Sequence, residues 1–235
     1  MHAHLIRAIE EYLGPTDEDK KLLTGLKLVL LVGPTAAGRN TLINELAKTG
    51  QYHYIRSDTT RDPQIRNGVI EIDGDVYNFV TESAALDKLL TRKYIEAAYV
   101  HDSYMNAIDS QELKAADDGN RIAIKDVEIH GEAKIEEMKS DVRVFFVLPP
   151  NYDEWMRRLH ARGELPAEEV EHRLRSAKQE LEDMIKNPVY ECIINDDLQA
   201  TTNRLHAMIS DDHQHQEWHE EGIRVAKELL EKLPR

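Results

Sequence analysis

The fold is decided by residues 26–41, LKLVLLVGPTAAGRNT. The residues up to Val32 are aliphatic apart from Lys27, which is typical of a buried strand. Gly33 then opens a turn, and a helical pattern follows over 40–47. A strand, a glycine-containing loop and a helix in this order aim backbone N–H groups and the positive end of a helix at one point. The stretch therefore predicts a phosphate-binding loop.

This loop departs from the usual pattern G-x-x-x-x-G-K-[ST] at two positions. Arg39 stands in the lysine position, where it keeps the charge but is a planar fork. Asn40 stands in the hydroxyl position and offers a carbonyl oxygen to Mg²⁺. Thr41 supplies a hydroxyl about 100° further round the helix. From the loop alone, a strand-to-helix turn that binds no ligand stays open as an alternative.

The rest of the chain alternates aliphatic strands with amphipathic helices. Strands are expected over 53–55, 69–72, 76–80, 94–100, 121–127, 142–148 and 189–194. Helices are expected over 3–13, 83–90, 110–116, 131–138, 153–161, 167–186, 196–209 and 223–233. This alternation favours an α/β fold with a mostly parallel sheet covered by helices.

Composition and charge narrow the choice of partners. The 235 residues carry a formal net charge of -14, which repels nucleic acid and acidic membranes. No run of apolar residues reaches the 18 or so that a membrane span needs, and the N-terminus lacks a signal-peptide pattern. The single cysteine, Cys192, cannot form an internal disulfide. We therefore expect a cytoplasmic protein with neither nucleic acid nor membrane as its partner.

Several further segments follow the loop, and their order along the chain is informative. They are SDTTR at 57–61, GDVYNFV at 74–80, YIEA at 94–97, DVEIHG at 126–131, VLPP at 147–150, RRLHARG at 157–163, HRLRSA at 172–177 and IINDDL at 193–198. Over about residues 27–209, this order and spacing closely resemble the guanylate kinase family. The resemblance implies a P-loop NTPase fold at 26–209, with a small β-rich GMP-binding region at about 57–107 and a helical lid at about 151–187. Helical extensions would then occupy 1–25 and 210–235.

The resemblance also implies a reaction, the transfer of the γ-phosphoryl group of ATP to GMP with Mg²⁺. The implied ATP-binding residues are Gly33, Pro34, Thr35, Ala36, Ala37, Gly38, Arg39, Asn40, Thr41 and Asn195. The implied GMP-binding residues are Ser57, Arg61, Tyr77, Glu96, Asp126 and Glu128. The implied catalytic residues are Arg39, Arg158, Arg162, Arg173 and Asp126, with Asn40 and Asp126 as candidate metal ligands.

Physical chemistry supports several of these roles. Hydroxyls and an arginine in 57–61 suit a second phosphate through charge-assisted hydrogen bonds. Asp126 and Glu128 are two apart on a strand, so their carboxylates share a face. A carboxylate that pairs with guanine's N1–H and amine loses a partner with adenine, at a cost of about 1–3 kcal/mol. Arginines in a mobile lid neutralise the transferring phosphoryl group and exclude water.

Other positions depart from the family and keep alternatives open. Gln64 stands where the family has a second phosphate-binding arginine, and Met105 and Ala107 replace a tyrosine and a serine. The connection over 66–73 is longer than usual. These losses, with Arg39, leave two alternatives: a catalytically impaired binding module, and a kinase of a different phosphorylated small molecule.

The C-terminal part raises two further questions. His213, His215 and His219, beside Asp211 and Asp212, form either a metal site or a solvated connector. The terminal helices either pack on the core or form a dimer interface, so monomer and homodimer both stay open.

Overall fold

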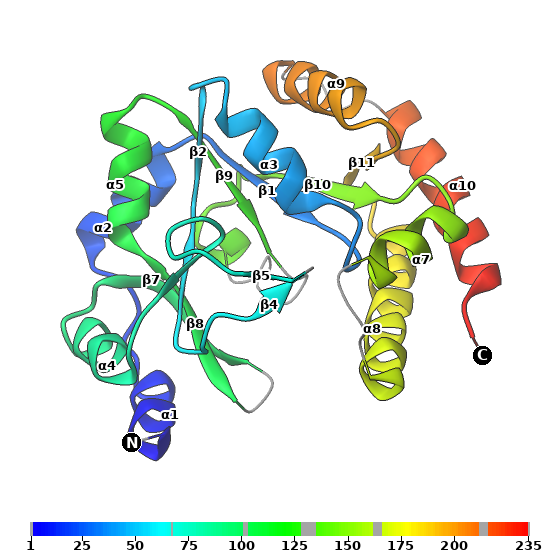
Figure 1. The fold of residues 1–235 in the computed structure, drawn as a ribbon. Helices are drawn as coiled ribbons and strands as arrows, with labels where there is room; N and C mark the ends of the chain where they lie inside the picture. Colours follow the sequence, from blue (N-terminus) through cyan, green and yellow to red (C-terminus); the bar gives the residue numbers. More distant parts are fainter. Residues whose placement is uncertain are drawn as a thin grey trace.

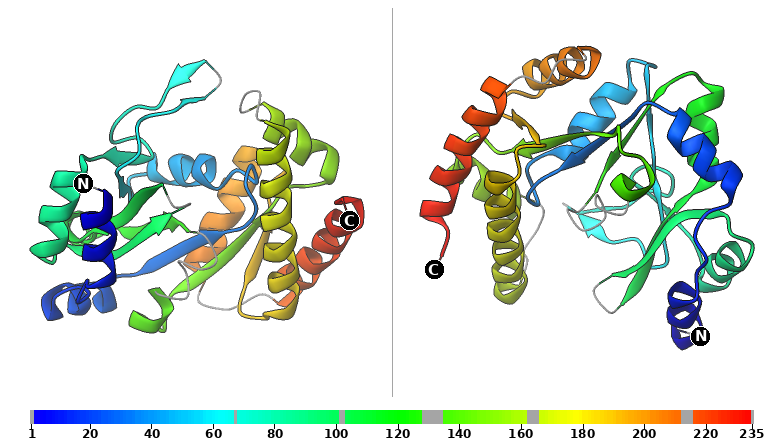
Figure 2. Two further views of the ribbon diagram at one scale, coloured as in Figure 1. Left: turned by 90° about the horizontal axis from the view of Figure 1, so that it is seen from below. Right: turned by 180° about the vertical axis from the view of Figure 1, so that it is seen from behind.

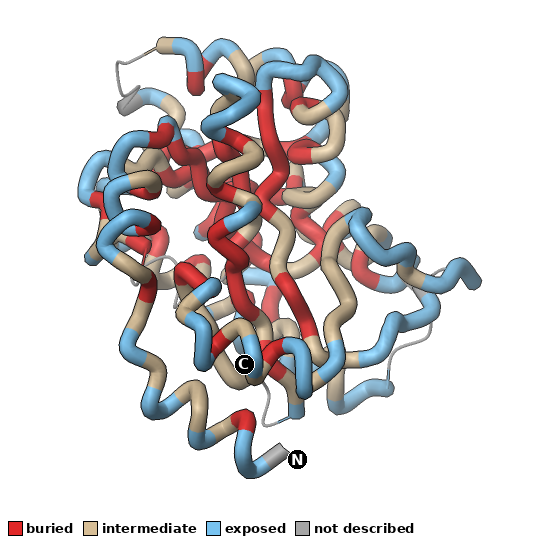
Figure 3. The backbone as a smooth tube through the Cα atoms, turned by 90° about the vertical axis from the view of Figure 1, so that its left-hand side faces the viewer, coloured by how far each residue is buried: buried red, intermediate tan, exposed pale blue. Residues whose placement is uncertain are grey.

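The computed structural model describes residues 2–66, 68–100, 103–127, 135–161, 166–211 and 216–234. Within these ranges the chain forms a five-stranded sheet, a four-stranded sheet and a two-stranded hairpin, with helices packed around them (Figure 1). Buried residues run through the middle of the molecule, and exposed ones follow the outer faces of the helices (Figure 3). The expected α/β class is confirmed.

The five-stranded sheet is parallel throughout, in agreement with the sequence prediction. Its strands stand in the order β11-β10-β1-β9-β2. Their bounds are β1 (Leu28–Val32), β2 (Tyr52–Tyr54), β9 (Ile122–Asp126), β10 (Arg143–Leu148) and β11 (Glu191–Ile194). All five residues of β1 are buried, because β1 lies in the centre of the sheet with helices on both faces.

Side chains that alternate along β1 enter two different cores. Val29 and Leu31 pack against α3 (Arg39–Ala47) and α9 (Leu198–Ser210) on one face. Leu30 and its neighbours pack on the other face. The helices there are α2 (Asp17–Gly25), α5 (Ser110–Asp118), α7 (Tyr152–His160), α8 (Ala167–Lys186) and α10 (Gln216–Lys232). The two-residue period of a strand therefore explains why helices cover both faces.

The four-stranded sheet lies beside the parallel one and has the order β6-β3-β8-β7. Its strands are β3 (Ser57–Thr59), β6 (Tyr77–Phe79), β7 (Tyr94–Val100) and β8 (Tyr104–Asp109). A third core, which includes Leu5, Leu89 and Tyr94, joins this sheet to α1 (His2–Glu10) and α4 (Glu82–Leu90). The hairpin of β4 (Ile65–Arg66) and β5 (Val69–Ile70) projects from the body (Figure 2, left).

Some elements differ from the sequence prediction. Residues 17–25 form α2, which the polar composition did not suggest; Thr16 caps it by accepting a hydrogen bond from the Asp19 backbone N–H. Strands β3, β4 and β8 were also not expected. Helix α10 begins at Gln216 instead of residue 223. Of the helix expected over 131–138, residues 135–138 are helical and 131–134 lie outside the described residues.

The two terminal helices pack on the rest of the chain. Leu5 of α1 lies in the third core, and Val225, Ala226 and Leu229 of α10 are buried against the parallel sheet. Gly222 lies so close to Cys192 of β11 that a Cβ there would be 2.3 Å from the cysteine Cβ. In the part of the chain that the structure describes, no helix has the length and apolar character to span a membrane.

Candidate functional site

The residues predicted to bind ATP, together with Asp126, lie at one edge of the parallel sheet. The phosphate loop follows β1, Asp126 ends β9, and Asn195 follows β11. Since parallel strands point the same way, their carboxyl ends meet at the same edge, where α/β proteins bind ligands. The strands β9 and β10 follow each other in the chain but lie on opposite sides of β1, so the strand order reverses at this point of the sheet. Open α/β sheets commonly bind their ligands at such a point.

The two glycines of the loop are required by its backbone. Gly33 has φ +127°, and a Cβ there would lie 2.4 Å from the Val147 carbonyl oxygen. Gly38 has φ +99°, and a Cβ there would lie 2.2 Å from Asn195 Nδ2. At both positions a residue other than glycine would clash with these atoms and would also strain the backbone. The structure therefore confirms a tight strand-to-helix loop at the expected position.

Side chains from two distant elements hold the loop by its carbonyl groups. Asn195 Nδ2 donates to the Ala37 carbonyl over 2.8 Å, and Trp155 Nε1 donates to the Thr35 carbonyl over 2.8 Å. Both side chains are buried. These two buried hydrogen bonds stabilise the conformation of the loop, as a preorganised phosphate site needs. Within the loop Pro34 and Ala36 are buried as well.

Arg39 and Asp126 lie where the loop meets the end of β9. Arg39 begins α3, and its Nη1 donates to the Val127 carbonyl over 2.7 Å. Asp126 Oδ1 accepts a hydrogen bond of 2.7 Å from the Tyr54 hydroxyl. Burial, reinforced by the charge of Asp126, raises the pKa of Tyr54 above its ordinary value, so this hydroxyl stays protonated and donates. Asn40 next to Arg39 is half-buried.

Two of the predicted lid arginines are in the described residues and have different partners. Arg158 Nη1 donates to the Asn195 carbonyl over 2.9 Å, and its Nε donates to Glu154. Arg173 is ion-paired with Glu169 one turn earlier in α8, over 2.8 Å. Arg158 therefore lies at the phosphate loop, whereas Arg173 is engaged within its own helix. Arg162 lies outside the described residues.

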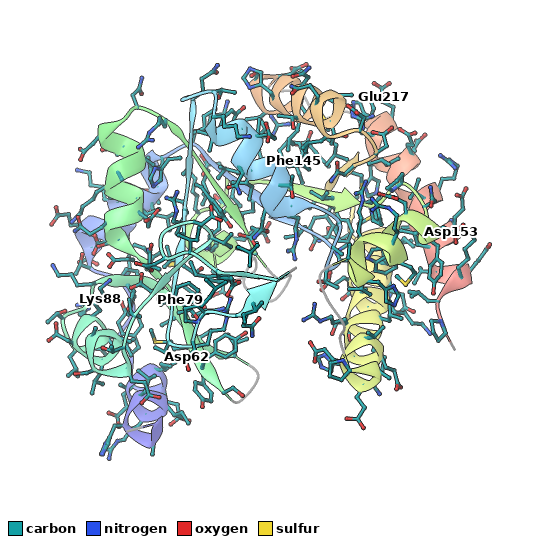
Figure 4. All side chains as sticks on the ribbon, in the orientation of Figure 1. Asp62, Phe79, Lys88, Phe145, Asp153 and Glu217 are labelled. Carbon is teal, nitrogen blue, oxygen red and sulfur yellow. The ribbon has the colours of Figure 1, made fainter. Side chains whose placement is uncertain are left out.

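The structure brings together three of the residues predicted to bind GMP. Ser57 of β3 and Tyr77 of β6 are register partners on neighbouring strands. The Arg61 guanidinium lies 4.8 Å from the centre of the Tyr77 ring. Arg61 also makes two hydrogen bonds with Glu71, of 2.5 and 3.0 Å. The residues predicted to bind the acceptor phosphate therefore lie close together, and the arginine among them is held by a carboxylate of the same chain. In the view of Figure 4, Phe79, which also belongs to β6, lies to the left and Asp153 of α7 to the right.

Lys125 contacts this group of residues through Ser57. It is 5% exposed, and its Nζ donates to the Ser57 hydroxyl oxygen over 2.7 Å and to the Ile55 carbonyl over 3.1 Å. Burial lowers the pKa of Lys125 below its ordinary value. The charges that oppose this shift belong to the carboxylates of Asp126, Glu96, Glu112 and Asp58. Glu96 is half-buried on β7, and Glu128 lies outside the described residues.

Asn40 and Asp126 are the metal ligands expected from the sequence. Among the described residues, no group of three or more His, Cys, Asp or Glu side chains could hold a metal ion. The oxygens of Asn40 and Asp126 are nevertheless of the type that Mg²⁺ prefers, and Mg²⁺ commonly takes its other ligands from substrate phosphates and water. His213 and His215 lie outside the described residues, and His219 Nδ1 donates to the Tyr190 carbonyl over 2.9 Å.

Four contacts of the site were not predicted from the sequence: those of Tyr54, Glu71, Lys125 and Trp155. A signal existed for Lys125, because a lysine inside the aliphatic run IAIKD is unusual for a buried strand. A weaker one existed for Glu71, an acid in the unusually long connection. Tyr54 and Trp155 carry no comparable sequence signal, since their hydroxyl and indole groups meet partners 72 and 120 residues away.

The chain is similar to known proteins over most of its length. The family model described as guanylate kinase matches residues 25–212. Guanylate kinase 1 of Oryza sativa subsp. japonica is 31% identical over 208 residues, covering 87% of this chain and 53% of that protein. The guanylate kinase of Sulfurimonas denitrificans is 32% identical over 180 residues, covering 76% and 84%. A crystal structure of guanylate kinase from Anaplasma phagocytophilum matches with a TM-score of 0.58 at 24% identity, covering 80% of this chain and 85% of that one.

These similarities differ in what they establish. The chain spans about half the length of the two plant relatives, the second being guanylate kinase 1 of Arabidopsis thaliana. The structural match shows the shared fold, a P-loop NTPase arrangement of parallel sheet and helices. The family model covers most of the chain, and the bacterial relative is similar over most of both sequences. By these measures the chain belongs to the guanylate kinase family.

Proposed function

We propose that the protein is a GMP kinase, which transfers the γ-phosphoryl group of ATP to GMP to give ADP and GDP. One observation carries the proposal: the end of β9 contacts both anion sites. The Val127 carbonyl accepts from Arg39 of the phosphate loop, and Lys125 donates to Ser57 of the second site. Asp126 lies between these two residues in the chain. A phosphate donor and a phosphate acceptor bound at the two sites would therefore face each other across one strand end.

Phosphoryl transfer depends on position and charge more than on a nucleophilic side chain. In the proposed roles, the loop from Gly33 to Thr41 binds the phosphates of ATP, with Arg39 and Arg158 supplying positive charge. Mg²⁺ would neutralise the donor phosphates, held on the protein side by Asn40 and Asp126. Arg162 and Arg173 would join when the lid closes, which requires Arg173 to leave Glu169.

Recognition of GMP would combine a phosphate site with carboxylates that read the base. Ser57, Arg61 and Tyr77 form the phosphate site. Glu96, on β7 of the same sheet, and Glu128 would accept hydrogen bonds from guanine. Adenine cannot supply this donor pattern, and a buried acceptor left unpaired costs about 1–3 kcal/mol. GMP is therefore expected to be strongly preferred over AMP.

The surroundings of the protein follow from the same features. A net charge of -14 disfavours nucleic acid as a partner. The buried free thiol of Cys192 suits a reducing compartment, and we propose the cytoplasm. Since α1 and α10 pack on the chain's own core, a monomer accounts for both helices, and a homodimer stays as the alternative.

A second candidate is a guanylate-kinase-like binding module with impaired catalysis. The pairing of Arg61 with Glu71 favours it, because the arginine of the acceptor site is already neutralised. The bond from Arg39 to the Val127 carbonyl also favours it, since one guanidinium nitrogen is already engaged by the chain itself. A kinase of a different phosphorylated molecule on the same fold is the third.

A coupled assay with ATP separates these candidates. The acceptors are GMP, dGMP, AMP, CMP and UMP, and the proteins are the wild type and Arg39→Lys. We expect GMP phosphorylation by the wild type, with little turnover of AMP. Absence of turnover in both proteins, together with absence of ATP binding, would exclude the kinase. Turnover of another nucleotide alone would change the substrate and keep the reaction.

Two neighbouring arginines of α7 provide a matched pair for the same assay. Arg158 contacts the Asn195 backbone carbonyl beside the loop, whereas the side chain of Arg157 is exposed and bonds only to Glu154 among the side-chain contacts that the structure describes. Arg158→Met should lower kcat at least about 100-fold, as removal of a charge-stabilising donor does. Arg157→Met should leave kcat close to that of the wild type. Equal losses in both variants would contradict the role given to Arg158.

A further inference from the structure

Lys125 is a buried lysine for which the reaction as described above has no use. It occupies the fourth position of β9, between Ile124 and Asp126, and only 5% of it is exposed. Its two neighbours in the strand point to the opposite face, because side chains alternate along a strand. Burying a lysine costs free energy unless its N–H groups are bound. The partners of Nζ therefore show what the residue does.

Those partners lie on the segment that leads into the second sheet. Nζ donates to the Ile55 carbonyl, 3.1 Å away, and to the Ser57 hydroxyl oxygen, 2.7 Å away. A lysine ammonium has N–H donors and no acceptor, so in both contacts the oxygen accepts. A serine hydroxyl has one hydrogen. Since the Ser57 oxygen accepts from Lys125, its own hydrogen is directed elsewhere.

The anion site lies on the strands around Ser57. Tyr77 is the register partner of Ser57 in β6, and the Arg61 guanidinium stacks over the Tyr77 ring. On β8, next to β3, Met105 and Ala107 are buried and bring no side-chain N–H or O–H to the site. Arg61 is engaged by Glu71. The binding of an anion at this site therefore depends on where the hydroxyl of Ser57 directs its hydrogen.

We propose that Lys125 is a positioning residue for the acceptor phosphate: it holds the Ser57 hydroxyl so that this hydroxyl donates to the phosphate of the nucleoside monophosphate. The inference rests on the proposed function, because it takes the site at Ser57 to be the acceptor site. The positive charge behind the hydroxyl also polarises the O–H bond and so strengthens the hydrogen bond to an anion.

A second buried lysine shows what a purely structural role looks like. Lys139 is 3% exposed, and its Nζ donates to the Thr24 carbonyl and to Asp141 Oδ1. Neither partner belongs to a predicted site. Lys139 therefore serves as the matched control for the removal of a buried amine.

The test compares Lys125→Met, Lys139→Met, Ser57→Ala and the double variant Ser57→Ala with Lys125→Met. Methionine keeps the length of the lysine side chain and removes the donor. Loss of one hydrogen bond to a charged group predicts a rise of about tenfold or more in KM for GMP in Lys125→Met. The KM for ATP and the melting temperature should stay close to those of the wild type. Lys139→Met should leave both KM values unchanged.

The double variant decides whether Lys125 acts through Ser57. If it does, Lys125→Met adds nothing to the KM for GMP once Ser57 is alanine. Independent, additive effects would overturn the proposal, as would a Lys125→Met enzyme with wild-type KM for GMP. A fall in melting temperature with unchanged KM would make Lys125 structural.

Calorimetric titration with GMP separates this inference from the proposed function. A wild type that binds GMP without turnover still allows the same cycle on the Kd, and a non-additive cycle would support the inference while the kinase fails. A wild type that binds no GMP overturns both. A wild type that is active and shows an additive cycle overturns the inference alone.

Discussion

Arg61 and Glu71 face each other as a bidentate ion pair, with N–O distances of 2.5 and 3.0 Å and side chains only 9% and 13% exposed. Glu71 Oε2 also accepts from the Gln64 backbone N–H, so the carboxylate joins both ends of the hairpin to the arginine. The Arg61 guanidinium also lies over the rings of Tyr77 and Phe79, 4.8 and 5.4 Å from the ring centres. Arg61 therefore stabilises the hairpin and, in the proposed function, also binds a phosphate.

Removal of Arg61 alone should harm the protein more than removal of both partners. Arg61→Met leaves the Glu71 carboxylate nearly buried without its cation, which should lower the free energy of unfolding by about 2 kcal/mol. The double variant, with Glu71→Met, should recover most of this loss in urea denaturation. GMP binding should be absent from both proteins. A double variant less stable than Arg61→Met would show that the pair is not the source of the loss.

Asn195 should matter for ATP and not for GMP. Its side-chain amide donates to the Ala37 carbonyl, and its backbone carbonyl, which alanine keeps, accepts from Arg158. In Asn195→Ala the loop loses a buried donor, so KM for ATP should rise about tenfold while KM for GMP stays constant. Asn203→Ala, an exposed amide on α9, is the control and should behave as the wild type. An equal rise in both KM values would contradict a role confined to the loop.

Gly33 and Gly50 allow a steric effect to be separated from backbone strain. Both have positive φ, but a Cβ at Gly33 meets the Val147 carbonyl whereas a Cβ at Gly50 meets nothing within 4 Å. Gly50→Ala should cost about 1 kcal/mol of stability from strain alone and keep activity. Gly33→Ala should abolish ATP binding, measured by calorimetry on the folded protein. ATP affinity retained in Gly33→Ala would show that the loop tolerates a displaced β10.

The thiol of Cys192 should be inert in the folded protein. Burial raises the pKa of Cys192 to about 12, so at pH 8 it is a neutral thiol, and only the thiolate reacts. Labelling with a thiol reagent should therefore be slow until denaturant is added. In Gly222→Ala the new methyl group pushes α10 away from β11, and labelling should become faster. Fast labelling of the native wild type would contradict the packing of α10.

Linkage gives this thiol a second consequence. Its pKa in the folded state lies above the ordinary value of 9.0, so the folded state holds the proton more tightly. Stability from this group is constant below about pH 9 and falls as the pH rises toward about 12. A Cys192→Ala variant should lack this contribution to the alkaline decline in melting temperature.

The local patterns of the sequence predicted much of the fold. The helix over 167–186 has the expected bounds, because its apolar positions recur at helical spacing over five turns. β1 and the loop could be predicted from another local pattern, an aliphatic run that ends in glycine. By contrast β3 has the sequence SDT, in which no apolar alternation exists. Its pairing with β6 and β8 stabilises it, and pairing partners are not visible in a local pattern.

In the candidate site, too, some residues could be predicted from local patterns and others could not. Gly33, Gly38 and Asp126 could be placed because motif and strand direction together fix where they lie. The contacts of Lys125 and Trp155 join residues 68 and 120 positions apart, so only the folded chain shows them. Glu71 is closer in sequence to Arg61, but the hairpin that brings it there has two-residue strands without a strong signal.

The hydrogen bond from Trp155 to the Thr35 carbonyl also gives the protein an optical reporter of its own. The chain has two tryptophans, and the other, Trp218, lies in α10 with the Arg204 guanidinium 5.4 Å from its ring. In Trp218→Phe, emission would come from the single indole that touches the phosphate loop. Titration of that variant with ATP should shift the wavelength of its tryptophan emission. A double variant that also carries Trp155→Phe has no tryptophan and should show no such signal. The binding of ATP could therefore be followed without a label.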